Sequence, residues 1–123
     1  MQDRRKYQRF NLEDAVFLKF ESDLAKIIEG KLLDISFGGL SIFLKESIEL
    51  GAIVQAIVQF NSPNVLEKQL VGRGTVVHAS QYSLNGQDGF RIGLEFIEVD
   101  KEIVINIIDK LRSKILPQIR NKS

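Results

Sequence analysis

The chain contains no cysteine, a single histidine and no long hydrophobic run. Without cysteine it can form no disulfide, no thiolate zinc site and no cysteine nucleophile. Its longest nonpolar run without glycine extends only from Ala15 to Leu18. Such a run is far too short for a transmembrane helix or for the hydrophobic region of a signal peptide. We therefore expect a cytoplasmic protein that does not insert into a membrane.

The usual signatures of catalysis are also missing. His78 is the one histidine, no Gly-x-Ser-x-Gly nucleophile motif is present, and the acidic residues lack metal-ligand spacing. His78 fits a surface or edge position at the end of a strand better than the role of a general base. The sequence thus favours a binding protein over an enzyme, and it predicts neither a metal ion nor a cofactor.

The composition indicates one globular domain with an uneven charge distribution. The 123 residues, 44% hydrophobic and 27% charged, are enough for one domain that folds alone. Residues 1–10 carry four bases against one acid, whereas residues 11–109 carry eight bases against fifteen acids. An acidic middle argues against binding to duplex DNA, which requires a broad basic face. The clustered N-terminal bases suit a small anion with one or two phosphates.

Alternating hydrophobic residues predict six short strands. The expected strands cover residues 16–21, 26–36, 40–44, 53–60, 69–79 and 90–97. Turn residues 85, 86, 88 and 89 precede the sixth strand, and Gly72 and Gly74 suggest a bulge or a tight bend in the fifth. Closure into a barrel would remove exposed sheet edges. We therefore predict a mainly β fold, a six-stranded antiparallel barrel over residues 15–99, after an N-terminal arm of residues 1–14.

The hydrophobic period changes to about 3.6 after the sixth strand, which predicts a C-terminal helix over residues 100–120. The residues on its apolar face are Val104, Ile107, Ile108, Leu111, Ile115 and Ile119. Asp100 is placed to cap the helix, and Pro117 should kink or stop it. The apolar face must be covered by one mouth of the barrel, by a partner protein or by a second copy of the chain.

Two short segments contain residues suited to binding a ligand. The first, residues 4–10, has three arginines in six positions, and arginine pairs bidentately with phosphate or with the Hoogsteen edge of guanine. The second is Asp34-Ile35-Ser36-Phe37-Gly38-Gly39, in which Asp34 and Ser36 should share one face of a strand. Gly38 and Gly39 would let a ligand approach the backbone closely. Taken alone, a solvated basic tail and a plain hairpin turn are the simpler interpretations of these segments.

Taken together, the two segments resemble those of the PilZ family, whose cyclic di-GMP receptors carry an RxxxR motif and a [D/N]xSxxG motif on a six-stranded barrel. Residues 5–9 fit the first motif, with Arg4 supplying the extra arginine often seen before it, and residues 34–39 fit the second. The pair in this order and on a barrel-like strand pattern is fairly specific. The resemblance extends from about Arg4 to Val99, and it implies a PilZ-like barrel of the split-barrel type.

The resemblance also implies a role for each motif residue. Arg5 and Arg9 would hold phosphates and guanine Hoogsteen edges, and Arg4 would favour an intercalated dimer of the ligand. Asp34 would read guanine, and Ser36 would bind phosphate or guanine. Gly38 and Gly39 would leave room for the ligand, so that Gly39→Val should block binding without unfolding the barrel.

The implied function is a cyclic di-GMP receptor whose N-terminal arm, mobile without ligand, folds over the dinucleotide as a switch. It would regulate an unidentified protein partner in motility, exopolysaccharide synthesis or virulence, as a monomer or as a homodimer through the C-terminal helix. Two alternatives remain open from the sequence. One is a small nucleic-acid-binding barrel, and the other is a PilZ-like adaptor that binds proteins and no nucleotide.

Overall fold

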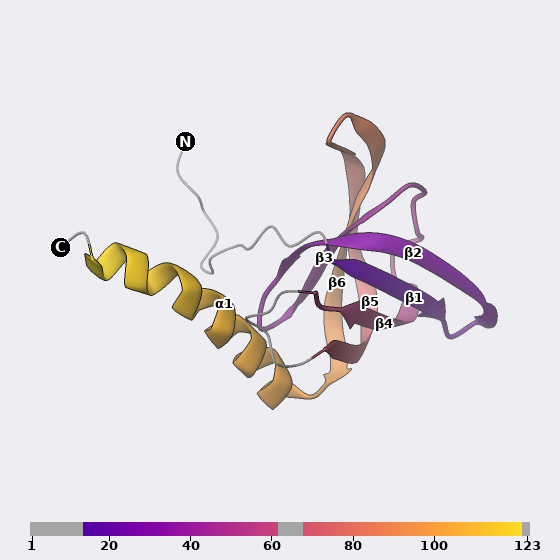
Figure 1. Ribbon diagram of the computed structural model, residues 1–123. Helices are drawn as coiled ribbons and strands as arrows, with labels where there is room; N and C mark the ends of the chain where they lie inside the picture. Colours follow the sequence, from indigo (N-terminus) through magenta and orange to yellow (C-terminus); the bar gives the residue numbers. More distant parts are fainter. Residues whose placement is uncertain (1–13, 62–67, 122–123) are drawn as a thin grey trace.

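The chain forms a closed six-stranded antiparallel barrel followed by one long helix (Figure 1). The computed structural model describes residues 14–61 and 68–121, and the side chains of the helix as far as residue 111. The elements are β1 (Ala15–Phe20), β2 (Asp23–Ile35), β3 (Gly39–Leu44), β4 (Ile53–Gln59), β5 (Gln69–Leu84), β6 (Gln87–Val99) and α1 (Lys101–Asn121). Their order around the barrel is β1-β2-β3-β6-β5-β4, and β4 pairs with β1 to close it. The predicted fold class is confirmed.

The barrel interior is filled by the alternating hydrophobic residues that predicted the strands. On β4, for example, Val54, Ala56 and Val58 are buried in the core, while Gln55 between them is exposed. Opposite them on β1, Val16 pairs with Val58 and Leu18 pairs with Ala56. A strand presents alternate side chains to opposite faces. This pattern therefore determines which residues of each strand lie on the outer surface of the barrel.

The β5–β6 hairpin is longer than the sequence predicts. We expected the fifth strand to end at Ala79, but it continues to Leu84, and its pairing with β4 ends at Thr75. The two-residue turn Asn85-Gly86 has positive φ angles of 53° and 79°. Such turns need positive φ at both positions to match the right-handed twist of the flanking strands. Asp88 and Gly89, expected in the turn, belong to β6. The outer part of the hairpin therefore projects from the barrel, as Figure 1 shows.

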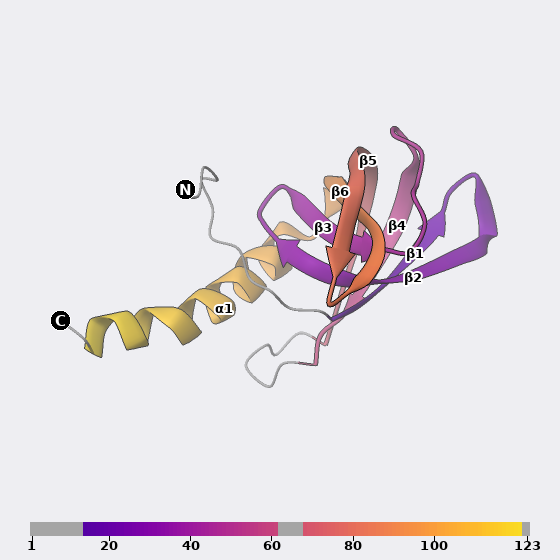
Figure 2. The ribbon, with the colours of Figure 1, turned by 90° about the horizontal axis from the view of Figure 1, so that it is seen from above.

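The first turns of α1 belong to the same core as the barrel. Asp100 caps the helix as predicted, because its Oδ1 accepts the backbone N–H groups of Glu102 and Ile103 at 3.1 and 3.3 Å. The buried residues of its apolar face are Val104, Ile107, Ile108 and Leu111, all within the hydrophobic core cluster. The helix then extends away from the barrel in both ribbon views (Figures 1 and 2). It continues through Pro117 to Asn121, so the expected stop at Pro117 is wrong.

Candidate ligand-binding site

Asp34 lies on the outer surface of the barrel because a β-bulge changes the phase of β2. Leu32 pairs with Ile42 and Asp34 pairs with Ser41, which leaves Leu33 as an extra residue on this strand. Leu32 and Ile35 both lie in the core. With strict alternation Asp34 would face the core together with Leu32. The bulge therefore turns the carboxylate outward, as bulges near binding sites commonly do.

The expected binding turn, residues 36–39, is a tight connection between β2 and β3. The Ser36 backbone N–H donates to the Gly39 carbonyl at 3.0 Å, and the Gly38 N–H donates to Ser36 Oγ at 3.3 Å. The Ser36 hydroxyl thus stabilises the turn itself. The interpretation of this segment as a hairpin turn is confirmed, and it is compatible with a ligand because Ser36 is half-buried and Gly38 is exposed.

The two glycines of this turn have different surroundings. A Cβ atom on Gly39 would lie 1.9 Å from the carbonyl oxygen of Leu94 on β6, whereas a Cβ atom on Gly38 would meet nothing within 4 Å. Gly39 is therefore required by the packing of β3 against β6. Our expectation that Gly39→Val leaves the barrel folded is wrong, because the space next to Gly39 is filled by protein backbone.

Strand register aligns Asp34 with outward positions on three other strands. Asp34 pairs with Ser41 on β3, Ser41 with Gly93 on β6, and Gly93 with His78 on β5. His78 is exposed and lies 3.0 Å from Ser80 Oγ through its Nε2. It is a surface residue as expected, but it lies within β5 and not at its end. The row forms one continuous outer face across four strands, and a Cβ atom on Gly93 would lie 3.1 Å from the Cβ of His78.

Arg91 contacts the carboxylate at this face. Its Nη2 lies 3.1 Å from Asp34 Oδ2, and its Nε donates to Ser41 Oγ at 2.7 Å. The guanidinium carbon lies 6.0 Å from the centre of the Tyr82 ring. A hollow of about 540 Å³ beside the hairpin is lined in part by Tyr82 and Phe90, but not by Asp34. We give more weight to the face around Asp34, since the motif residues and the ion pair lie there.

The first described residue of the chain lies next to β2, near Asp34. Arg4, Arg5 and Arg9 lie outside the described residues. The described chain starts at Asp14, whose carbonyl oxygen accepts the backbone N–H of Leu32 at 2.7 Å. Asp14 is buried, and this burial raises the pKa of its carboxyl group, although the Asn61 backbone N–H that it accepts lowers it in part. The chain that leads to the arginines is thus attached two residues from Asp34.

Sequence comparison identifies the family to which this arrangement belongs. A family model described as the PilZ domain matches residues 3–113, which includes both motifs and the whole barrel. The chain belongs to the PilZ domain family. No curated protein matches it by sequence.

Solved PilZ structures share the fold at low sequence identity. The PilZ domain of YcgR from Escherichia coli, solved with c-di-GMP, has a TM-score of 0.68 and 15% identity, with 98% of this chain and 97% of that chain covered. The inhibitor of motility MotI/DgrA from Bacillus subtilis has a TM-score of 0.69 and 18% identity, over 93% of this chain and 53% of that chain. The MrkH–c-di-GMP complex of K. pneumonia has a TM-score of 0.68 and 18% identity, over 98% and 56%. The chain thus spans about half the length of two of these PilZ proteins.

Sequence reasoning missed the partners of Asp34. Arg91 and Ser41 were not predicted as site residues, although the alternation in the sixth strand already places Arg91 on the outer face. The missing information was the pairing of β3 with both β2 and β6.

Within the described residues no helix is long and apolar enough to cross a membrane, and no group of three acidic or histidine side chains could hold a metal ion.

Proposed function

We propose that this PilZ domain is a receptor for cyclic di-GMP, with Arg5 and Arg9 on the phosphates and guanine Hoogsteen edges and Asp34 on a guanine. The observation that carries this proposal is the hydrogen bond between Asp14 and Leu32. It attaches the chain beside Asp34. The four residues between Arg9 and Asp14 make five Cα–Cα steps, which can span at most about 17 Å. The RxxxR segment can therefore reach the ligand face.

The chemistry of the face fits guanine. An ionised carboxylate only accepts hydrogen bonds, so Asp34 suits the N1–H and N2–H donors of guanine and not the N1 acceptor of adenine. The arginines would add planar guanidinium groups for two phosphates. The PilZ domain of YcgR and MrkH were both solved in complex with c-di-GMP. These likenesses support the same ligand here.

The turn residues have more limited roles in this proposal. Ser36 holds the turn through its hydroxyl group and would offer its remaining hydrogen-bonding capacity to the ligand. Gly38, with open space where a side chain would be, would let the ligand lie against the backbone. Gly39 contributes by allowing β3 and β6 to approach each other, and thereby sets the position of the turn.

The alternative as a nucleic-acid-binding barrel is less well supported. Binding of single strands generally uses several aromatic side chains as stacking platforms. Among the described residues, the exposed aromatic side chains are Phe37 and Tyr82. Phe37 lies in the β2–β3 turn and Tyr82 on the β5–β6 hairpin. These two side chains do not form a row of stacking positions along one groove.

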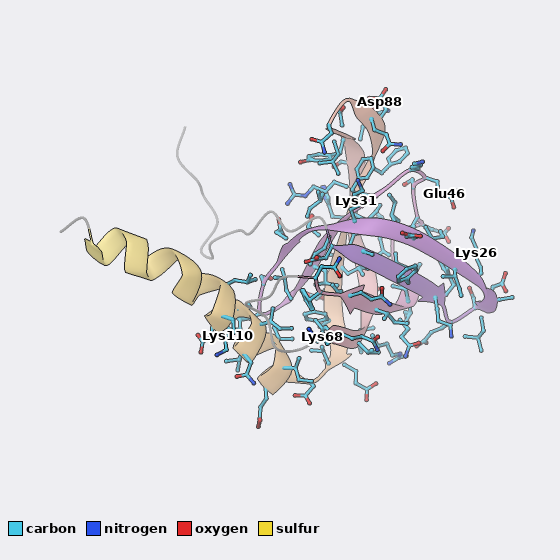
Figure 3. The ribbon with its side chains drawn as sticks, in the orientation of Figure 1. Lys26, Lys31, Glu46, Lys68, Asp88 and Lys110 are labelled. Carbon is cyan, nitrogen blue, oxygen red and sulfur yellow. The ribbon has the colours of Figure 1, made fainter. Side chains whose placement is uncertain are left out.

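Calorimetric titration with cyclic di-GMP tests the proposal. Wild type should bind, and Arg5→Ala or Arg9→Ala should each cost about 2 to 3 kcal/mol, roughly a 30- to 150-fold loss of affinity, as for a charge-assisted bidentate pair. Lys110→Ala is the control, because it removes an exposed positive charge from α1 (Figure 3). Cyclic di-AMP should bind poorly to wild type, and Asp34→Ala should reduce this discrimination. Wild-type affinity weaker than millimolar, or equal binding of a single-stranded oligonucleotide, contradicts the proposal.

A further inference from the structure

Asp34 and Arg91 form a largely buried ion pair on the outer face of the barrel. The exposed fractions of the two side chains are 14% and 22%, respectively. By comparison, the ion pair between Glu21 and Arg73 leaves about two fifths of each side chain exposed. The cost of removing two charges from water can exceed the attraction between them, so a largely buried ion pair is weak evidence for a stabilising role. The Asp34–Arg91 pair therefore calls for a functional explanation.

The geometry holds the guanidinium group in one place. Arg91 projects from β6, and its Nε and Nη2 point to two different acceptors, Ser41 on β3 and Asp34 on β2. Ser41 is buried, with 6% of its surface exposed. The Tyr82 ring on β5 lies near the guanidinium group. Four strands thus determine the position of Arg91, and Arg91 in turn restricts the rotation of the Asp34 carboxylate.

We propose that Arg91 is a positioning residue that fixes the Asp34 carboxylate in the orientation needed to read both the N1–H and the N2–H of guanine. This inference rests on the proposed function of the face as a cyclic di-GMP site. A carboxylate has about four acceptor positions, so it can accept a hydrogen bond from Arg91 and from a base at the same time. Two parallel hydrogen bonds to a guanine edge require a defined carboxylate plane, and a side chain already held in that plane loses little freedom on binding.

Cyclic di-IMP provides a readout that a purely structural role would not change. Its hypoxanthine base retains N1–H but lacks the N2 amino group of guanine. Wild type should prefer cyclic di-GMP over cyclic di-IMP about tenfold, the usual effect of one charge-assisted hydrogen bond. Arg91→Gln should weaken cyclic di-GMP binding about tenfold and reduce this preference to about twofold.

A double-mutant cycle tests whether Arg91 acts through Asp34. Because the effect of Arg91 depends on the carboxylate, the variant carrying both Asp34→Ala and Arg91→Gln should bind cyclic di-GMP within about twofold of Asp34→Ala alone. Arg73→Gln is the matched control, since it breaks the ion pair with Glu21 on another part of the barrel. It should leave affinity and base preference unchanged.

Arg91→Lys covers the case in which Arg91→Gln does not fold. Lysine keeps the positive charge and the aliphatic stem, but its single ammonium group cannot reach Ser41 and Asp34 in two fixed directions. This variant should fold, as judged by circular dichroism, and should still lose most of the preference over cyclic di-IMP.

The outcomes separate this inference from the proposed function. If wild type binds no cyclic di-GMP, both are overturned. If wild type binds but folded Arg91→Gln or Arg91→Lys keeps the wild-type preference, the inference is overturned and the receptor function stands. Additive losses in the double variant also overturn it, because they mean that Arg91 acts independently of Asp34.

Discussion

At the scale of single residues, the two glycines of the β2–β3 turn separate folding from binding. Gly39→Ala should destabilise the barrel strongly, because the new Cβ would lie within 1.9 Å of a backbone oxygen that cannot move without shifting β6. Overpacking of this kind usually costs about 1 to 3 kcal/mol or more. Gly38→Ala should leave stability within about 0.5 kcal/mol of wild type, because its Cβ meets open space. Urea unfolding of both variants measures the difference.

The same two variants also report on the ligand. Gly38→Ala is folded in this prediction, so a loss of cyclic di-GMP affinity in that variant would locate the ligand against the turn. A Gly39→Ala protein as stable as wild type would contradict the close approach of β3 and β6 described here.

The buried carboxyl group of Asp14 should make stability depend on pH. Burial raises its pKa above the ordinary value of 3.8, so the folded state holds the proton more tightly than the unfolded state. The resulting cost of ionisation is absent below pH 3.8, grows as the pH rises from 3.8 to the folded pKa, and is complete above the folded pKa. Asp14→Asn keeps an acceptor for the Asn61 N–H and removes this cost. The stability of Asp14→Asn relative to wild type should therefore increase from pH 3.5 to pH 7 in urea unfolding, and a constant difference would contradict the assignment.

The sequence could predict which residues of the second motif belong together, but not how they are held. The spacing of Asp34 and Ser36 and the two glycines were visible in one short segment. The bulge at Leu33 was not, because Leu32 and Leu33 are both leucines and give no sign of which one is extra. The contact between Asp34 and Arg91 joins residues 57 positions apart, so it becomes visible only when the register of β2, β3 and β6 is known.

At the scale of elements, strand and helix patterns were predictable where one face is buried and the other exposed. The outer half of β5 was missed because both of its faces project beyond the barrel, so residues 80–84 show no hydrophobic alternation. At Pro117 the sequence left a kink or a stop open, and α1 does not stop there but continues to Asn121. Proline removes one backbone donor and disfavours the helix interior. Residues 101–116 before it already form about four turns of helix, and the Asp100 cap and the buried face nucleate these turns.

The Asp100 cap should contribute measurably to the stability of α1. Asp100→Ala removes the oxygen that accepts two N–H groups of the first turn, and such a change typically costs about 1 kcal/mol. Asp109→Ala is the control, since this exposed aspartate lies within the helix and alanine is the better helix former. The midpoint of urea unfolding, followed by helical circular dichroism, should fall for the first variant only. Equal midpoints for Asp100→Ala and wild type would contradict the role of the cap.

At the scale of the whole molecule, the barrel provides a rigid frame and the two ends of the chain provide basic charge. β1 is paired on one side with β2 and on the other with β4. The strand next to the RxxxR segment therefore cannot shift without opening the barrel. A signal produced by ligand binding is more easily carried by residues outside this hydrogen-bonded frame. The sequence predicts such residues in the segment 1–10, which has no strand or helix period.

Hydrogen exchange with and without cyclic di-GMP should reveal which part of the molecule responds. Ordering the backbone costs about 1 to 2 kcal/mol per residue, so a ligand that folds the arm over itself lowers its own affinity but creates a new surface for a partner. We expect protection to appear at residues 4–10 and around 34–39 on addition of ligand. The core amides of β1 and β4 should exchange at unchanged rates, because their ladder hydrogen bonds are already complete. Arg9→Ala should be measured at a ligand concentration that saturates the variant. Any remaining loss of protection in the arm then reports a loss of ordering and not a loss of affinity. An arm that is fully protected before ligand is added would rule out the arm as the switch and leave α1 or the β5–β6 hairpin to carry the signal.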